Sequence, residues 1–357
     1  MADTPTVRWG IVTTGLISSW FVEDLALPRG DAKAKHVIQC IGSSSVEKGQ
    51  AFVKEHIASL SPTLYGTYDE VYADPNVDVV YIGTPHAFHK KNCLDAINAG
   101  KHVLCEKAFT ITAKEAREVF AAAKAKGVFV MEAMWTRFFP LMRTLQKLIH
   151  EDKVIGDVSR MFCDFGQAKE LASLGPDSRF KSLALGAGTL LDVGIYSLTF
   201  GLVTLDPGVG ESAEMPKIAA QQTLSDGVDI ATTAVLLYKS GRQGIVTSSA
   251  LFKTPDVFCR IEGSKGYITV EGDAVSRPEY FIVHPTVPES KGGAPSKRYD
   301  FENPKRGFYW EADAVALDVA AVKKESSIMP WAETIRVMEI MDEIRRQGGA
   351  KYPQDDE

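Results

Sequence analysis

Two pairs of residues in this 357-residue chain have the types and spacing needed for acid–base chemistry. Glu106 and Lys107 follow the apolar run Val103–Cys105, which predicts a carboxylate and an amine at the end of a buried strand. Asp192 and Tyr196 are four residues apart, so on a helix their side chains share one face. Ligands bind at the carboxyl ends of parallel strands, where such groups could accept or donate the proton of a reacting hydroxyl.

Each of these residues also has a plainer interpretation. Glu106 and Lys107 could be a solvated surface pair, Asp192 an inward residue bonded to backbone, and Tyr196 a core tyrosine. If the lysine and the tyrosine act together, the ammonium lowers the phenol's pKa and burial lowers the lysine's own pKa. Coupled groups titrate as a pair, so either could be the base.

The elements that would position these residues begin with the strand-type run Val7–Val12, followed by a tight turn and a helical pattern. The turn matches a dinucleotide fingerprint in part, because Gly15 and Ser18 keep two of its small positions whereas Thr13 replaces the first glycine. In that fingerprint the glycines let the backbone approach a pyrophosphate at the helix amino terminus. An ordinary strand-to-helix turn is the alternative.

The second buried strand, His36–Gly42, leads into the serine run Ser43–Ser45 without an acidic residue at its end. An NAD-preferring site usually has one there to bond the ribose 2′-hydroxyl, so NADP is favoured. The three hydroxyls and Lys48 could accept a 2′-phosphate. The alternative is that the serines cap the next helix only.

A third strand, Val77–Ile82, ends in a loop in which Thr84 and Pro85 suit a cofactor-facing turn. His89 in this loop could contact the cofactor or simply begin a helix. Strands and helices continue to alternate up to Met134, which predicts an α/β Rossmann domain over residues 1–134 with a doubly wound parallel sheet.

From Trp135 onward the pattern changes, with a helix predicted at Gly188–Val203 and then several strand-like runs. The runs are Asp229–Tyr238, Gly244–Leu251, Val257–Glu262 and Tyr267–Val270. Residues 135–357 are therefore predicted to form an α+β domain with an open, largely antiparallel sheet, through which a homodimer could form. The two C-terminal helices are assigned to this domain, with packing on the first domain as the alternative.

Composition limits the classes of function. A net charge of −6 without a long basic run argues against nucleic acid, and no run of about 18 apolar residues suggests a membrane span. Met1–Thr6 lacks the features of a signal peptide, so we expect a cytoplasmic protein that acts on small molecules. Five widely spaced cysteines in mostly apolar runs favour reduced thiols over disulfides or a metal site.

Several of these segments together resemble the glucose-fructose oxidoreductase/inositol dehydrogenase (Gfo/Idh/MocA) family, and most closely its branch of dimeric dihydrodiol dehydrogenases and NADP-dependent D-xylose 1-dehydrogenases. The segments that carry the resemblance are Trp9–Val12 through Ser18, Tyr81–Thr84, Leu104–Lys107, Met131–Ala133, Trp135–Pro140 and Leu190–Tyr196.

The resemblance implies that Lys107 is the catalytic lysine of the family's Glu-Lys-Pro motif, with Tyr196 as its acid/base partner and Asp192 assisting. It also implies that Trp135 and Phe165 line the substrate pocket together with these three residues. The resulting cofactor set consists of Thr13, Thr14, Gly15, Leu16, Ile17, Ser43, Ser44, Ser45, Lys48, Thr84, Pro85, His89, Glu106, Lys107, Trp135 and Arg137.

Three residues depart from the family pattern. Ala108 stands in place of the motif proline, which removes a fixed φ and could loosen the placement of Lys107. Thr13 replaces a glycine, and Tyr196 occupies a position that is histidine in much of the wider family. A histidine-based mechanism therefore does not carry over directly.

The predicted function is NADP-dependent oxidation of a cyclic polyol, foremost the C1 hydroxyl of an aldose such as D-xylose to the lactone. One alternative is oxidation of trans-dihydrodiols to catechols, and another is a regulator that binds NADP without turnover. The presence of Lys107, Asp192 and Tyr196 together favours an enzyme, since a sensor has no need of an acid/base set.

Overall fold

The computed structural model describes residues 4–356, so half of the Met1–Thr6 segment considered above lies outside the described range. The chain forms two compact units. The first comprises Met1–Trp135 and Lys305–Ile335, and the second comprises Thr136–Pro304 and Arg336–Glu357. The chain therefore leaves the first unit after Trp135 and returns to it for one segment.

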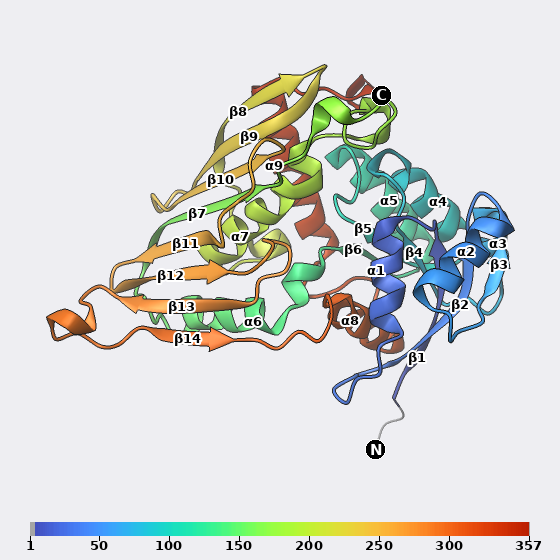
Figure 1. The fold of residues 1–357 in the computed structure, drawn as a ribbon, viewed down its shortest axis with the longest axis horizontal. Helices are drawn as coiled ribbons and strands as arrows, with labels where there is room; N and C mark the ends of the chain where they lie inside the picture. Colours follow the sequence, from blue (N-terminus) through green and yellow to red (C-terminus); the bar gives the residue numbers. More distant parts are fainter. Residues whose placement is uncertain (1–3, 357) are drawn as a thin grey trace. The chain divides into compact units, whose positions relative to one another are not determined.

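The first unit is built on a parallel sheet in the strand order β3-β2-β1-β4-β5-β6 (Figure 1). The strands are β1 (Thr6–Val12), β2 (Lys35–Gly42), β3 (Thr63–Tyr65), β4 (Val79–Ile82), β5 (His102–Glu106) and β6 (Val130–Ala133). Every residue of β4 and β6 is buried, as expected for parallel strands covered on both faces. The predicted doubly wound sheet is confirmed.

Six helices belong wholly to this unit, and they divide between the two faces of the sheet. They are α1 (Leu16–Leu25), α2 (Val46–His56), α3 (Tyr68–Ala73), α4 (His89–Asn98), α5 (Ala113–Lys126) and α8 (Phe308–Ala320). Helices α1, α2 and α8 pack together, whereas α3, α4 and α5 pack together on the other face. Threonine side chains cap α3 and α5, with Thr67 and Glu70 forming a reciprocal capping box.

Helix α8 comes from the returning segment and is tied to α1. The Asp24 carboxylate accepts the backbone N–H groups of Gly307 (2.6 Å) and Phe308 (3.0 Å), which are left without partners at the start of α8. The ring of Phe21 stacks on Tyr81 and meets the edge of Phe308. These contacts make Lys305–Ile335 an integral part of the first unit.

The second unit contains an eight-stranded sheet in the order β14-β13-β12-β11-β7-β10-β9-β8. Its strands are β7 (Val158–Gly166), β8 (Lys217–Ser225), β9 (Val228–Leu237), β10 (Gln243–Ser249), β11 (Val257–Gly263), β12 (Gly266–Glu271), β13 (Tyr280–Pro285) and β14 (Lys297–Asp300). Only β7 and β10 pair in parallel among these described strands. The predicted open, largely antiparallel sheet is confirmed.

Helix α7 (Ile195–Leu205) packs on one face of this sheet, against β7 and β10. The remaining helices are α6 (Pro140–Gln146), which continues as the π-helix Lys147–Glu151, and α9 (Trp331–Gly348), within which the division between units falls. By length and composition alone, Leu183–Leu205 could cross a membrane. The most apolar part of this stretch is 72% buried within the fold, which is typical of a core helix, so a membrane span is only weakly indicated.

The single regular helix predicted for Gly188–Val203 is wrong in detail. Leu190–Gly194 is π-helical, and α7 begins only at Ile195, so Asp192 and Tyr196 lie on two different helical segments. Gly188 has a φ of +145°, which no helical residue adopts, so the helical stretch starts after it. The five cysteines are free and buried, and within residues 4–356 no cluster of His, Cys, Asp or Glu could hold a metal ion.

Candidate active site

The turn between β1 and α1 has the features of an anion-binding loop. Thr13 adopts a φ of +86°, the left-handed region that favours glycine, and its Oγ1 accepts the N–H of Gly15 at 2.9 Å. Gly15 is the N-cap of α1 and provides no side-chain cap, and the first turn has no acidic residue. The N–H groups of this helix start are therefore suited to a phosphate.

A second observation at this turn fits a bound dinucleotide. Ser18 is buried, and its Oγ has no hydrogen-bond partner among the described residues. Gly83, at the end of the adjacent strand β4, approaches so closely that a Cβ there would meet Ser18 Oγ. Leu16 is 68% exposed, which is unusual for a leucine at the first position of an otherwise buried helix.

The serine run combines the two interpretations given above. Ser45 caps α2 by accepting the N–H of Lys48 at 3.4 Å, so the capping role is present. Ser44 is exposed, and its Oγ accepts a 2.8 Å hydrogen bond from the Lys48 ammonium. An exposed hydroxyl next to an ammonium fits a phosphate ester, since both can donate to its oxygens.

His89 is fully buried and lies against backbone. Its Nε2 is 2.7 Å from the carbonyl oxygen of Thr84, and its Nδ1 is 3.0 Å from that of Ala108. Burial lowers the pKa of His89 to about 4, so the ring is neutral at pH 7 and carries one N–H. Because a neutral ring donates one hydrogen bond, only one of these two carbonyl oxygens accepts from His89, and the ring lies between the strand-end loop at Thr84 and the segment that follows Lys107.

Glu106 and Lys107 lie at the end of β5, and the surface-pair alternative is wrong. Glu106 is only 3% exposed. Its Oε1 accepts a 2.7 Å hydrogen bond from the Tyr81 hydroxyl, and its Oε2 accepts the backbone N–H of Lys107 at 3.3 Å. Lys107 is half-buried. Glu106 therefore positions the backbone at the residue that carries the amine.

The segment after Lys107 is well anchored although it lacks the motif proline. The peptide bond between Lys107 and Ala108 is cis, and Ala108 is fully buried. The N–H of Phe109 donates to Glu132 Oε1 at 3.1 Å, on the neighbouring strand β6. This hydrogen bond fixes the chain at the residue after Ala108, and the effect of the missing proline on the placement of Lys107 stays a prediction.

Sequence reasoning missed three buried side chains behind this strand end, namely Tyr81, Glu132 and Glu311. Glu311 on α8 is fully buried, and neither of its oxygens has a hydrogen-bond partner within residues 4–356. Burial, together with the negative charges of Glu106, Asp24 and Glu132, raises its pKa well above the ordinary value. Charged residues inside apolar runs, such as Glu132 in Met131–Ala133, were the signal available in the sequence.

In the second unit, the structure brings together Phe165 and Tyr196, both predicted to contact substrate. Tyr196 is 4% exposed, and its ring meets the edge of Phe165 at 5.7 Å between centroids. Asp192 Oδ1 lies 2.7 Å from Nη2 of Arg179. Arg179 was missed because it lies in the loop Gly166–Phe180, whose conformation has no periodic signal.

A hollow of about 280 Å³ lies beside Phe165 in the second unit, and its polar lining includes Gln167, Lys253 and Asp273. A larger hollow of about 560 Å³ lies in the first unit at the amino ends of the strands, the edge opposite to Lys107. The lining of this hollow includes the ion pair between Arg8 and Asp78. The larger volume does not by itself identify the functional site. The smaller hollow includes Phe165, one of the predicted substrate residues, in its lining.

The remaining predicted residues have varied surroundings. Trp135 is 4% exposed and stacks on Phe308, with centroids 4.2 Å apart, so within the first unit it packs as a core residue. Arg137 is buried in the second unit. Thr14, Ile17 and Pro85 are half-buried. Lys107 and the predicted cofactor turn therefore belong to the first unit, whereas the predicted substrate residues Phe165, Asp192 and Tyr196 belong to the second.

Comparisons with known proteins agree with this arrangement. Residues 7–134 match a family described as an oxidoreductase family with an NAD-binding Rossmann fold, and residues 142–269 match the GFO/IDH/MocA C-terminal domain. The chain is 36% identical to a D-xylose 1-dehydrogenase (NADP(+)) of Hypocrea jecorina, over 98% of this chain and 94% of that one. It is 34% identical to a trans-1,2-dihydrobenzene-1,2-diol dehydrogenase of Sus scrofa, and the alignment covers 98% of this chain and 99% of that protein. The structure of an aldose-aldose oxidoreductase from Caulobacter crescentus superposes with a TM-score of 0.80 at 20% identity. The superposition covers 96% of this chain and 98% of that one.

Proposed function

This chain belongs to the GFO/IDH/MocA oxidoreductase family, and from that premise we propose that it oxidises a ring hydroxyl of a cyclic polyol with NADP. The foremost substrate is an aldose such as D-xylose, oxidised at C1 to the lactone. The observation that carries the proposal is the amine of Lys107 at the carboxyl end of β5. Lys107 directly follows Glu106, whose carboxylate accepts a hydrogen bond from Tyr81. In the sheet, β4 alone lies between β5 and β1, the strand that leads into the dinucleotide turn.

NADP is the cofactor that the first unit fits. The uncapped start of α1 would hold the pyrophosphate, and Ser44 with Lys48 would hold the 2′-phosphate. No acidic residue in β2 would repel that phosphate. When bound, the nicotinamide supplies the acceptor for a hydride.

The protein's own residues handle the proton. Oxidation of an alcohol removes a hydride from carbon and a proton from oxygen, so a positioned acid/base is required. We assign that role to Tyr196 and Lys107 as a coupled pair, with Asp192 assisting. The contact between Asp192 and Arg179 supports this assignment, because it orients the carboxylate from outside the helix.

A second candidate is the oxidation of trans-dihydrodiols of arenes to catechols. The dihydrodiol dehydrogenase relatives are nearly as similar to this chain as the xylose dehydrogenase is. The aromatic ring of Phe165, beside Tyr196, could pack on a flat ring substrate. The two candidates differ in the polarity of the substrate, because an aldose presents more hydroxyl groups.

A panel of aldoses and trans-dihydrodiols, each with NADP and with NAD, tests both candidates at the nicotinamide absorbance. We expect turnover of aldoses with NADP at the highest kcat/KM. Turnover confined to dihydrodiols would replace the first candidate with the second. No turnover with any member of the panel would overturn the proposal.

We also propose a homodimer formed through the open face of the second unit's sheet. On β7 the side chains of Arg160 and Phe162 are exposed, whereas Met161 and Cys163 point into the core. Such a mixed aromatic and charged face suits a self-complementary contact. Sedimentation that finds only monomer at micromolar concentration would contradict it. The cytoplasmic location and the exclusion of nucleic-acid and membrane partners stay predictions.

A further inference from the structure

The helical stretch that carries Asp192 and Tyr196 begins on a buried carboxylate. Oδ2 of Asp229, the second residue of β9, accepts the backbone N–H of Leu190 at 2.8 Å and the hydroxyl of Thr189 at 2.7 Å. Thr232 donates a third hydrogen bond to the same oxygen at 3.1 Å. Asp229 is 1% exposed. A carboxylate at a helix amino terminus satisfies an otherwise unpaired N–H and interacts favourably with the helix dipole.

The chain immediately before this stretch is held by Tyr352. The Tyr352 hydroxyl donates a 2.6 Å hydrogen bond to the carbonyl oxygen of Ala187, and the residue is 1% exposed. The next residue, Gly188, has a φ of +145°, and a Cβ there would collide with Asp229 Oδ1 and Tyr352 Oη. The two side chains therefore converge on the point at which the backbone turns into the helix.

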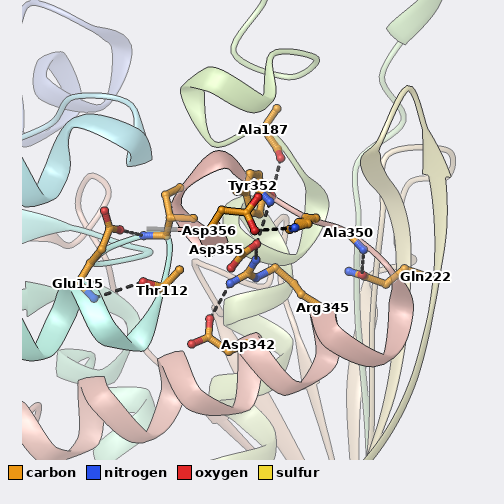
Figure 2. A network of polar contacts seen from close by, with 12 residues as sticks. Thr112, Glu115, Ala187, Gln222, Asp342, Arg345, Ala350, Tyr352, Asp355 and Asp356 are labelled. Atoms are coloured by element: carbon orange, nitrogen blue, oxygen red, sulfur yellow. Dashed lines mark hydrogen bonds and ion pairs between the residues drawn. The ribbon is translucent and has the colours of Figure 1, made fainter.

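Tyr352 is itself fixed by the C-terminal segment, as Figure 2 shows. Arg345 on α9 forms 2.6 Å ion pairs with Asp342 and Asp355. Asp355 also accepts the N–H of Tyr352 at 2.8 Å. Tyr352 is thus held by a turn that the Arg345–Asp355 ion pair and the Asp355 hydrogen bond fix without its hydroxyl, so removal of the hydroxyl alone leaves those contacts in place.

We propose that Asp229 and Tyr352 are positioning residues for the reaction, which fix the start of the helical stretch so that Asp192 and Tyr196 are presented in one geometry. The inference rests on the proposed catalytic roles of Asp192 and Tyr196. Neither positioning residue is assigned a proton-transfer role. They act through the backbone at Ala187–Leu190.

The alternative is that these contacts only stabilise the second unit. Asp229 is an inefficient residue for that purpose, because its Oδ1 is buried without a partner. Burial raises the pKa of Asp229 to about 6, although the three hydrogen bonds oppose the shift. An asparagine would keep the acceptor for Leu190 without burying a charge. The position therefore requires the oxygen that fixes Thr189 and Leu190 rather than the negative charge.

Four variants of the full-length protein separate the two explanations, namely D229A, D229N, Y352F and the control Y238F. Tyr238 is another buried tyrosine of the same unit, immediately after the opposite end of β9. For each variant, kcat and KM are measured with NADP and the best substrate of the panel. Hydrogen exchange of the backbone over residues 187–198 is measured on the same samples.

We expect kcat to fall about 10-fold in D229A and about 3-fold in Y352F, since a lost cap or hydrogen bond displaces the acid/base groups. KM for NADP should stay within about 2-fold, because the cofactor residues lie on other elements, and hydrogen exchange over residues 187–198 should increase. In D229N, kcat should stay within about 3-fold of the wild-type value. The control Y238F should change neither kcat nor the hydrogen exchange over residues 187–198.

Unchanged kcat and unchanged exchange over residues 187–198 in Y352F, and in D229A if it folds, would overturn the proposal. Faster exchange without a change in kcat would also overturn it, since the residues would then be merely structural. If the wild type turns over no substrate of the panel, the proposed function fails. Hydrogen exchange then still tests the positioning of the helix, with unchanged exchange in D229A or Y352F contradicting it.

Discussion

The hydroxyl of Tyr81 donates a 2.7 Å hydrogen bond to Oε1 of Glu106 within the core of the first unit. Burial and the adjacent Glu106 carboxyl raise the pKa of Tyr81 well above its ordinary value, so the phenol keeps its proton and remains the donor. Glu106 in turn accepts the N–H of Lys107. The central strand β4 is thereby linked to the residue that presents the amine.

Replacement of Tyr81 by phenylalanine removes this link and takes one hydrogen bond from a buried carboxylate. We expect a loss of about 1–3 kcal/mol in the free energy of unfolding and a kcat about 5-fold lower. KM for NADP should not change. Tyr65→Phe, on the edge strand β3, is the matched control, because that hydroxyl only reaches Asp74 at 3.4 Å. Lost stability with an unaltered kcat would contradict the positioning role of Glu106.

Lys48→Ala tests the assignment of NADP. The ammonium would donate a charge-assisted hydrogen bond to the 2′-phosphate, so KM for NADP should rise about 10-fold while KM for NAD stays the same. Lys54→Ala, in the last turn of the same helix, should have no effect on either. Equal changes in both KM values would mean that Lys48 does not read the phosphate.

Glu311→Met tests whether the buried carboxyl is a cost to the fold. Because neither oxygen has a partner, the variant should be more stable at pH 7 by about 1–3 kcal/mol in urea unfolding. The pKa of the Glu311 carboxyl is raised in the folded state. The stability that its bound proton provides is therefore complete below the unfolded-state pKa of 4.5, and it is lost as pH rises through the folded-state pKa. The gain from the variant should therefore grow with pH. A destabilised variant would reveal an essential contact of this carboxyl.

Asp229 should also make stability depend on pH. Its pKa is raised from 3.8 to about 6, so the native state binds the proton more tightly than the unfolded chain. The stability this provides is complete below about pH 4 and disappears as pH rises through about 6, an effect of up to about 3 kcal/mol. The difference between wild type and D229N in urea unfolding from pH 4 to 8 measures it. A difference that does not vary with pH would show that Asp229 does not titrate in this range.

Local patterns were sufficient to predict five of the six described parallel strands, all except the three-residue β3, because those strands contain short apolar runs. The quoted motifs likewise identified the family, and the comparisons confirm it. Strands β3, β8, β13 and β14 were not predicted. Many polar residues hide the alternation in β8 and β14, and β3 has only three residues. The π-helix at Leu190–Gly194 depends on Asp229, almost forty residues away, and no local signal encodes such a contact. The partners Tyr81, Arg179 and Tyr352 were missed for the same reason.

NADPH formation by the Lys107→Ala variant tests the central assignment most directly. The wild type and the variant are compared with the best aldose or dihydrodiol and NADP, after circular dichroism has shown that both are folded. Removal of the amine should lower kcat/KM by about 100-fold or more, because general acid–base groups contribute on this scale. NADPH formation at the wild-type rate in the folded variant would contradict the role assigned to Lys107.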